Sequence, residues 1–251
     1  TSDIGNMLQG KVAGVQITNA GGQPGDAAEI RIRGTGSITA SSAPVYVVDG
    51  VMGGSFNPQD VETISVLKDA GATGIYGAAA AGGVIVVTTK SGKKNEKVTV
   101  DVKATAGAKQ ALYQNYKMMD AKELYSFHQQ LYSKGVFSAM YPKELMKENH
   151  NWQDEFFRTG VIQDYYVSVK GGSDKVGYYA GLNYYDEQGT LITTGMQKFS
   201  ANLNLNAQIT KWLDMKAKVT FTKSTVDYPS SWTMLDDAFN KMPWDNPYEL
   251  D

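Results

Sequence analysis

Five charged residues in the first third of the chain have the types and spacing to bind charged partners. They are Arg31, Arg33, Asp49, Glu62 and Lys68. The two arginines alternate with isoleucines, so both guanidinium groups should leave the same face of a strand. The other three stand at the ends of other short predicted strands. Arginine binds carboxylates through two parallel hydrogen bonds, so such a group could hold one surface against another. Simple solvation of the same charges is the alternative, and the sequence leaves both open.

Groups for catalysis or metal binding are poorly represented. The chain has no cysteine, which excludes a disulfide framework, a thiolate nucleophile and a zinc site built on sulfur. The two histidines, His128 and His150, lack the His-Glu-x-x-His spacing of a zinc site. Gly34-Thr35-Gly36 lacks the third glycine and the lysine of a phosphate-binding loop. Adjacent carboxylates such as Asp154-Glu155 need not share a site. We therefore expect no enzyme activity, no metal and no cofactor.

Composition and charge indicate a folded chain without a nucleic-acid partner. Of the 251 residues, 42% are hydrophobic and 20% are charged, which is enough to build a core. The net charge of -2 favours neither nucleic acid nor an anionic surface globally. The 26 glycines and 15 tyrosines, beside only 7 prolines, favour β structure with tight turns.

Residues 1–92 are expected to form a small α+β domain. Short apolar runs alternate there with turn signals, which is typical of short strands joined by loops. The runs lie at 12–17, 30–32, 44–48, 64–67 and 84–89. An alanine-rich tract between 68 and 81 predicts a short helix that ends at glycine. The polar residues 91–95 then form a linker.

Residues 93–251 show strict apolar and polar alternation instead. The period is two, which predicts about five long strands that each bury one face. They are centred on 97–108, 165–170, 175–184, 198–209 and 213–222. Most reach about ten residues, the length with which a tilted strand crosses a bilayer, whereas ordinary strands have about five or six.

The connections between these strands support a membrane barrel. Short links at 171–174 and 210–211 alternate with longer ones at 110–161, at 186–197 and from 224 onward. Outer-membrane barrels alternate short periplasmic turns with longer outer loops in the same way. About five strands cannot close a barrel, because an open edge in hydrocarbon leaves amides unpaired. We therefore expect a piece of a longer protein, unless the sheet is soluble and covered on its apolar face.

The longest connection is predicted to contain a helix on the outer rim. Asp120 and Glu123 have the spacing of a capping box, and Gly135 should end the helix. Its apolar face is expected to consist of Leu124, Phe127 and Leu131.

Several motifs, in this order and spacing, resemble the SusC/RagA family of TonB-dependent outer-membrane transporters. In the first half they are LQGKVAGV at 8–15, IRIRG at 30–34, PVYVVDGV at 44–51, ISVLKDA at 64–70, IYG at 75–77 and VIVVTTKSG at 84–92. In the second half they are WQDEFFRTG at 152–160 and FSANLNL at 199–205. The resemblance covers nearly the whole chain.

The resemblance implies a plug domain over residues 1–92 and the N-terminal part of a transmembrane β-barrel over 93–251. It implies import of an oligosaccharide or peptide across the outer membrane of a Gram-negative, Bacteroidetes-type bacterium. Cargo would bind between plug and barrel, and the TonB complex would displace the plug by force. A SusD-like surface lipoprotein and outer-membrane lipid would be the other partners. No substrate-binding residue is identified.

The sequence departs from the family pattern in one tract. After Ile-Tyr-Gly the family usually continues with a serine and an arginine, whereas here residues 78–82 are four alanines and a glycine. A role of that arginine therefore does not transfer to Ala79. The TonB-contacting box is expected upstream of Thr1, so TonB contact is not located in these residues.

Two other interpretations remain open at this stage. The strands of a soluble carbohydrate-binding β-sandwich would also alternate apolar and polar residues, but their apolar side chains would contact a second sheet. A hydrolase would need two carboxyl groups about 5 to 10 Å apart in a cleft, and no spacing favours this.

The position of Arg33 before Gly34 in a family-like motif leads to a first prediction. If Arg33 anchors the plug, Arg33→Ala in the full transporter loosens it and raises the leak of small solutes. Unchanged leak together with unchanged uptake rejects this role.

Overall fold

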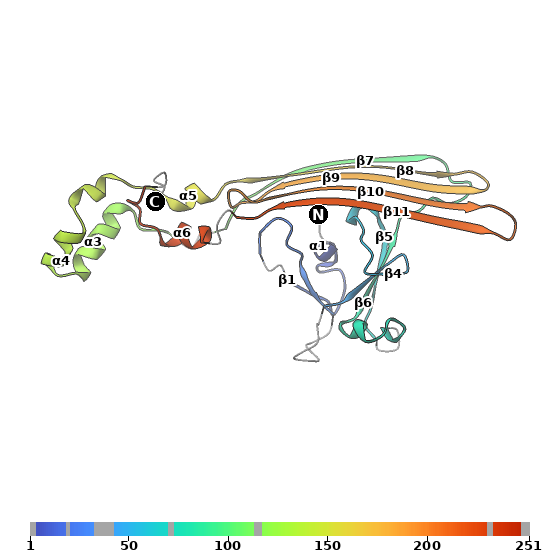
Figure 1. Cartoon of the computed structure of the whole chain (residues 1–251), viewed down its shortest axis with the longest axis horizontal. Coiled ribbons are helices and arrows are strands. Elements are labelled where there is room, and N and C mark those ends of the chain that lie inside the picture. The colour runs from blue at the N-terminus through green and yellow to red at the C-terminus, as the bar shows by residue number, and fades with distance from the viewer. Residues whose placement is uncertain are drawn as a thin grey trace.

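The computed structural model describes residues 4–18, 21–32, 43–69, 73–112, 117–229 and 233–246. Figure 1 shows a long curved sheet, a smaller N-terminal domain beneath it, and a helical arm at one end. The helices are α1 Ile4–Leu8, α3 Ala121–Leu131, α4 Lys134–Met140, α5 Trp152–Phe156 and α6 Met234–Asn240, with 3-10 turns η1 Pro58–Asp60, η2 Gly74–Tyr76, η3 Ala78–Gly82 and η4 Lys143–Lys147. The strands are β1 Gln16–Thr18, β2 Glu29–Arg31, β3 Val45–Val48, β4 Val51–Met52, β5 Val61–Leu67, β6 Val84–Thr89, β7 Thr99–Lys109, β8 Gly160–Gly172, β9 Val176–Gln188, β10 Gly195–Gln208 and β11 Asp214–Asp227.

The N-terminal domain, which extends from α1 to β6, is built around one mixed sheet. Its strand order is β4-β3-β6-β5, with β3 and β6 parallel and the other pairs antiparallel. Strand β6 is an apolar run, and Val84, Ile85 and Val87 are fully buried. Burial on both faces of a central strand explains why this run is continuous and not alternating.

The core of this domain joins elements that are distant in sequence. Residues of α1, β2, β3 and β6 form one buried cluster: Ile4, Leu8, Ile30, Ile32, Val48, Ile85 and Val87. The expected strands near 30, 45, 64 and 84 are present. The tract from 68 to 81 contains 3-10 turns η2 and η3 instead of the predicted short helix, although residues 70–72 lie outside the described part of the chain. Gly74 and Gly77 interrupt this tract, and Gly82 and Gly83 follow it, which favours short turns over a helix.

The large sheet, called the wall below, contains five antiparallel strands in the order β11-β10-β9-β8-β7. Each has 11 to 14 residues, which confirms the long alternating strands predicted from the sequence. The connection between β9 and β10 is shorter than predicted, because Gln188 pairs with Gly195 and leaves only residues 189–194 as the loop. The backbone hydrogen bonds between β9 and β10 continue beyond the residues in which apolar and polar side chains alternate.

In a soluble protein the buried face of a sheet is usually apolar and the exposed face polar. In the wall the exposed face is apolar and the face towards the N-terminal domain is polar. One row across the outer face is apolar and exposed, with Val102 at 71%, Leu182 at 48% and Phe221 at 54%. On β8, β9 and β10 the side chains of the other face are mostly polar and largely buried against the N-terminal domain, whereas on the outer strands β7 and β11 most of them are exposed. The buried side chains of this face include Asp164, Tyr166, Ser168, Tyr179, Asn183, Ser200, Asn202 and Asn204. The side of the wall that meets the protein interior is therefore the polar one.

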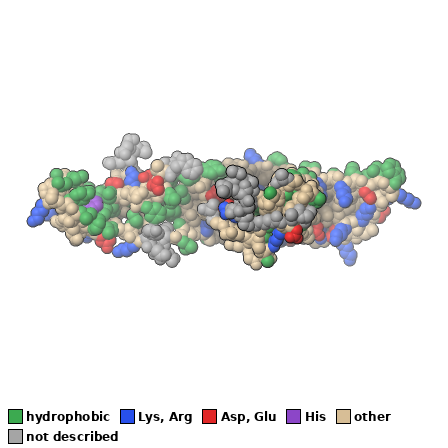
Figure 2. Space-filling view, turned by 90° about the horizontal axis from the view of Figure 1, so that it is seen from below, with side chains coloured by type: hydrophobic (Ala, Val, Ile, Leu, Met, Phe, Trp, Pro, Cys, Tyr) green, Lys and Arg blue, Asp and Glu red, His purple; other side chains and the backbone are tan. Residues whose placement is uncertain are grey.

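The helical arm is formed by α3 to α5, between β7 and β8, and by α6 after β11 (Figure 1). Figure 2 shows hydrophobic side chains gathered over this arm. The capping box is present as predicted, because Asp120 accepts a hydrogen bond from the Glu123 backbone and Glu123 accepts one from the Asp120 backbone. No helix in the described ranges is long and apolar enough to cross a membrane.

The end and the buried face of α3 differ from the prediction. The helix stops at Leu131, and Gly135 lies inside α4. The buried residues are Ala121, Tyr125 and His128, whereas Phe127 and Leu131 are exposed. Aromatic contacts decide the face: Tyr125 packs on Phe137 and His128 on Tyr141, each at 4.8 Å between ring centroids. These partners follow α3 in sequence, so the periodicity of α3 alone did not reveal them.

The capping box gives a local prediction. Asp120→Ala removes the acceptor for the Glu123 backbone amide, so α3 should lose about 1 kcal/mol of stability. Amide hydrogen exchange of α3 in the full protein measures this loss. Asp120→Ser is the matched control, since serine also accepts this hydrogen bond. Equal exchange in both variants would show that packing alone holds the helix start.

Candidate functional site between the N-terminal domain and the wall

A buried carboxylate joins the N-terminal domain to the wall. Asp60 ends η1, a turn whose start is fixed by a hydrogen bond from the Gln59 amide to the Asn57 side chain at 3.1 Å. The Oδ1 atom of Asp60 accepts hydrogen bonds from the hydroxyls of Tyr166 at 3.1 Å and Tyr179 at 2.5 Å. Asp60 is 1% exposed. A buried carboxylate is costly unless it is hydrogen-bonded, so this contact depends on both tyrosines of the wall.

Lys90 places a positive charge beside this group. Its Nζ donates to the Gln59 carbonyl at 2.8 Å and to the Tyr166 hydroxyl at 3.3 Å, and it lies 5.2 Å from the centre of the Tyr166 ring. Burial lowers the pKa of the Lys90 amine, and the nearby Lys103 ammonium lowers it further. Lys90 thus offsets part of the Asp60 charge from within the same domain, while its own charge is partly disfavoured.

Asp49 forms a second connection at the end of β3. Its carboxylate accepts from the Thr89 amide at 2.9 Å and the Thr89 hydroxyl at 2.6 Å, and it pairs with Lys218 of β11 at 2.7 Å. Burial alone raises the pKa of this carboxyl, but the hydrogen bonds from Lys218 and Thr89 outweigh it and hold the pKa below its usual value. A carboxyl with a lowered pKa contributes stability above its ordinary pKa, and that contribution is lost as the pH falls through the lowered value.

Amide side chains of the wall bind the backbone that leaves β6. Asn204 Nδ2 donates to the Lys90 carbonyl at 2.5 Å, and Asn206 Nδ2 donates to the Gly92 carbonyl at 3.2 Å. On β8, two strands away from β10, Asp164 accepts a hydrogen bond from Gln59 Nε2 at 2.9 Å. The contacts therefore extend over β8, β9, β10 and β11.

Two glycines allow the close approach. A Cβ atom at Gly92 would lie 2.1 Å from the Tyr178 carbonyl oxygen, so the linker can cross the wall only without a side chain there. A Cβ atom at Gly181 would lie 2.6 Å from Asp60 Oδ1. Beyond Gly92, an ion pair between Lys170 and Glu96 at 2.9 Å holds the linker.

The charged residues singled out from the sequence lie in different places. Asp49 contacts the wall as described above. Arg31 pairs with Glu29 inside β2 at 2.6 Å, and Lys68 donates a hydrogen bond to the Ala13 carbonyl inside the N-terminal domain. Glu62 is exposed on β5. Arg33 lies outside the described residues.

The strongest contacts involve residues that sequence reasoning missed. Asp60 and Lys90 lie next to two strands that were predicted from their apolar residues, so these two charged residues at the strand ends were not considered as candidates. The partners on the wall, Tyr179, Asn204 and Lys218, alternate with the apolar residues of their strands. These alternating residues were treated only as a polar surface, and none of them was singled out. Asparagine at every second position from 202 to 206 was the available signal, because repeated amides on one strand face suggest many hydrogen bonds on that face.

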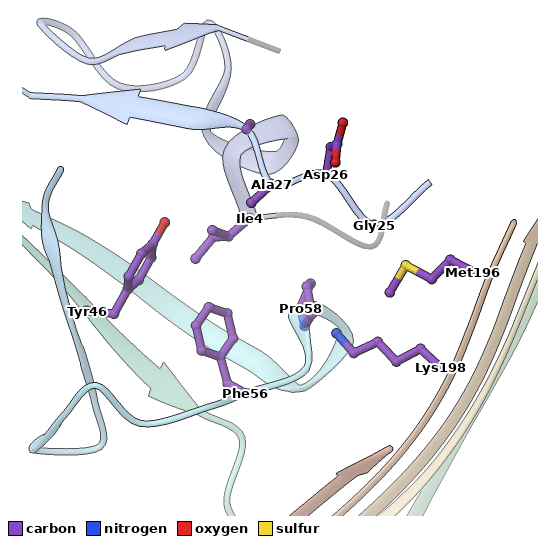
Figure 3. A pocket seen from close by; sticks show the side chains of 10 residues that line it. Ile4, Gly25, Asp26, Ala27, Tyr46, Phe56, Pro58, Met196 and Lys198 are labelled. Carbon is purple, nitrogen blue, oxygen red and sulfur yellow. The ribbon is translucent and has the colours of Figure 1, made fainter. Parts of the chain in front are cut away.

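A cavity of about 270 Å³ lies along the same interface. Figure 3 shows Tyr46, Phe56 and Pro58 of the N-terminal domain facing Met196 and Lys198 of β10. The cavity is thus shared between the two parts of the chain. Within the described ranges, no group of three or more His, Cys, Asp or Glu is placed to hold a metal ion.

Comparisons with known proteins match this arrangement. The family model of the TonB-dependent receptor plug domain matches residues 1–84. The chain is 37% identical to the TonB-dependent receptor SusC of Bacteroides thetaiotaomicron over 217 residues, covering 82% of this chain and 21% of that protein. It is 39% identical to the TonB-dependent receptor P3 of Formosa agariphila over 222 residues, covering 88% of this chain and 21% of that protein. The chain therefore spans about a fifth of the length of these relatives.

A solved structure shows the same fold. The RagAB peptide transporter superposes with a TM-score of 0.86 at 30% identity, over 99% of this chain and 32% of that one. The match includes both the N-terminal domain and the antiparallel strands, which here form an open sheet. The chain thus belongs to the SusC/RagA family of TonB-dependent receptors, and it combines the plug domain with antiparallel strands that match those receptors.

Proposed function

We propose that this chain is the plug and the first barrel strands of a TonB-dependent importer in the outer membrane of a Bacteroidetes-type Gram-negative bacterium. Residues 1–92 act as the plug and residues 93–251 as barrel wall with long outer loops. The observation that carries the proposal is the reversed polarity of the wall, whose polar face meets the plug while its apolar face is exposed. Such a surface suits lipid outside and a polar lumen inside.

The exposed apolar face has the height of a membrane. Its outer limit is an aromatic row of Tyr165, Tyr184 and Phe199, beyond which the next row is Gln163, Asp186 and Gln197. Its other limit lies near Ile209 and the exposed Trp212. From Phe199 to Ile209 there are about ten steps of about 3.4 Å, or about 34 Å along the strand. A tilt of about 40° reduces this to about 26 Å, close to the apolar band of about 25 Å in such barrels.

The soluble β-sandwich is less well supported by the same surface. A sandwich needs a second sheet on the apolar face, and the described part of the chain places none there. The partner of the wall is instead the small domain on its polar face (Figure 1).

The interface also fits a plug that moves under force. Its contacts are side-chain hydrogen bonds and ion pairs, at Asp60, Asp49 and the wall asparagines. Water can replace these partners as the plug separates, so the net cost is about 1 kcal/mol for a contact between neutral groups and about 1.5 to 3 kcal/mol for a contact to a charged group such as Asp60 or Asp49. We propose that the TonB complex supplies this work and that Asp49 and Asp60, with Arg33, anchor the resting plug.

The cargo and the remaining partners follow from the family. We propose that an oligosaccharide or peptide enters between plug and wall and that a SusD-like surface lipoprotein covers the outer side. The related RagAB is named a peptide importer, and SusC is named a TonB-dependent receptor.

Spin labels on β11 test the direction of the apolar face. In a full-length protein cleared of other cysteines, a label at Phe221→Cys should collide often with oxygen and rarely with a water-soluble nickel chelate, because Phe221 faces lipid. The matched label at Thr222→Cys, one residue on, faces the lumen and should show the opposite preference. Equal chelate access at both positions, or a Phe221 label shielded from both reagents, contradicts the proposal.

A methyl group placed against Asp60 tests the anchor. Gly181→Ala brings a Cβ atom to 2.6 Å from Asp60 Oδ1 and should displace the carboxylate from its tyrosines. Docking should weaken by about 2 kcal/mol, the order of a lost buried hydrogen-bond partner. Ion conductance of the full-length protein in planar bilayers should rise severalfold.

Gly107→Ala is the control for this change. It lies on β7 of the same wall, and a Cβ atom there would have no atom within 4 Å. Its conductance should match that of the native protein. Equal conductance of both variants would exclude Asp60 as an anchor.

A further inference from the structure

A second cavity, of about 340 Å³, lies in the helical arm. It is formed between the β7–β8 connection and the segment that follows β11. Its apolar wall includes Met119, Leu124, Trp152 and Met242. This volume lies within the range of small-molecule sites, which are typically apolar with a few polar groups.

The cavity is held together by defined contacts between the two segments. Trp152 Nε1 donates a hydrogen bond to the Met242 carbonyl at 2.7 Å, and the His150 amide donates to the Pro243 carbonyl at 2.7 Å. Phe157 and Phe239 also pack, with 6.3 Å between ring centroids. The two segments are about ninety residues apart in sequence, so the cavity is a product of the tertiary fold.

The chemistry of the cavity favours a flexible apolar ligand group. Met118, Met119 and Met242 contribute three thioether side chains, which adapt to apolar groups of different shapes. Asn240 is the neutral amide among the lining residues. An oligosaccharide would bring many hydroxyl groups that need polar partners, and burial without them is costly.

The rim of the cavity is basic. Lys117, His150 and Lys241 line it, and none of its lining residues is acidic. Lys117 already pairs with Glu123 at 3.2 Å and His150 lies 4.0 Å from Glu148, whereas Lys241 is exposed at the end of α6. An anionic group beside the apolar one would therefore meet a complementary charge at Lys241.

We infer that this cavity binds the C-terminal residue of a short peptide, with its apolar side chain among the methionines and its carboxylate at Lys241. This inference rests on the proposed import function and deepens it, because it selects peptide over oligosaccharide as the cargo class. The site lies on the outer side of the wall in the proposed orientation, where cargo first meets the protein.

Calorimetric titration of the purified full-length protein tests the inference with three probes: acetyl-Ala-Ala-Phe with a free carboxylate, the same peptide as its C-terminal amide, and maltohexaose. The acid should bind about fivefold more tightly than the amide, the size of an exposed ion pair. Lys241→Met should reduce the affinity for the acid to that for the amide and leave the amide unchanged. Maltohexaose should not bind at this site.

Lys134→Met is the matched control, since Lys134 is an exposed lysine at the start of α4 in the same arm and does not line the cavity. It should leave both affinities unchanged. Equal binding of acid and amide, binding of maltohexaose alone, binding of no probe, or an equal loss in both lysine variants overturns the inference. The label at Phe221→Cys reports separately on the lipid-facing wall on which the proposed function rests, so failure of one is distinguishable from failure of the other.

Discussion

The whole arrangement depends on one constraint: a polar surface has been buried, and every polar group in it needs a partner. The wall turns tyrosine, asparagine and aspartate side chains towards the N-terminal domain, and Tyr179 and Asn204 are almost completely inaccessible. Burial of such groups is tolerated only with hydrogen bonds. The plug supplies partners for Tyr179, the Asn204 amide nitrogen and Lys218 through Asp60, the Lys90 carbonyl and Asp49, whereas Ser200 Oγ and Asn204 Oδ1 have no hydrogen-bond partner among the described residues. The interface is thus held by matched polar pairs, while the apolar core of the plug lies apart from it around β6.

The same constraint explains why the interface suits reversible movement. An apolar contact of this size would resist separation through its whole buried area, whereas a hydrogen bond between protein groups is exchanged for one with water at small net cost. The buried charges are the exception to this small cost. On separation Asp60 loses both of its hydroxyl partners, and its carboxylate stays unpaired unless water replaces them. Lys90 would reduce this cost if the plug separated from the wall, because Lys90 belongs to the same side of the interface as Asp60 and stays bonded to it and to Gln59.

Much of the fold was predictable because alternation and apolar runs depend on local sequence. The alternation of apolar and polar residues in β8 to β11 is visible in the sequence. The continuous apolar run of β6 and the capping box of Asp120 are visible as well. Pairings across distance were not predictable. Arg31 was a candidate for anchoring one surface to another, with simple solvation as the alternative, and it binds Glu29 two residues away. Lys218 binds Asp49, which is 169 residues earlier in the sequence. The buried face of α3 followed from rings outside the helix. Periodicity reports which residues share a face, and it carries no information on what covers that face.

The spread of the contacts over successive strands has a consequence for how the molecule is put together. Asp164, Tyr179, Asn204 and Lys218 each belong to a different strand, and all of them must point inward for the small domain to dock. A slip of one residue in any pairing turns that strand's inward groups outward. Only a correctly aligned sheet completes the full set of bonds to the small domain. Docking of the small domain and alignment of the strands thus stabilise each other.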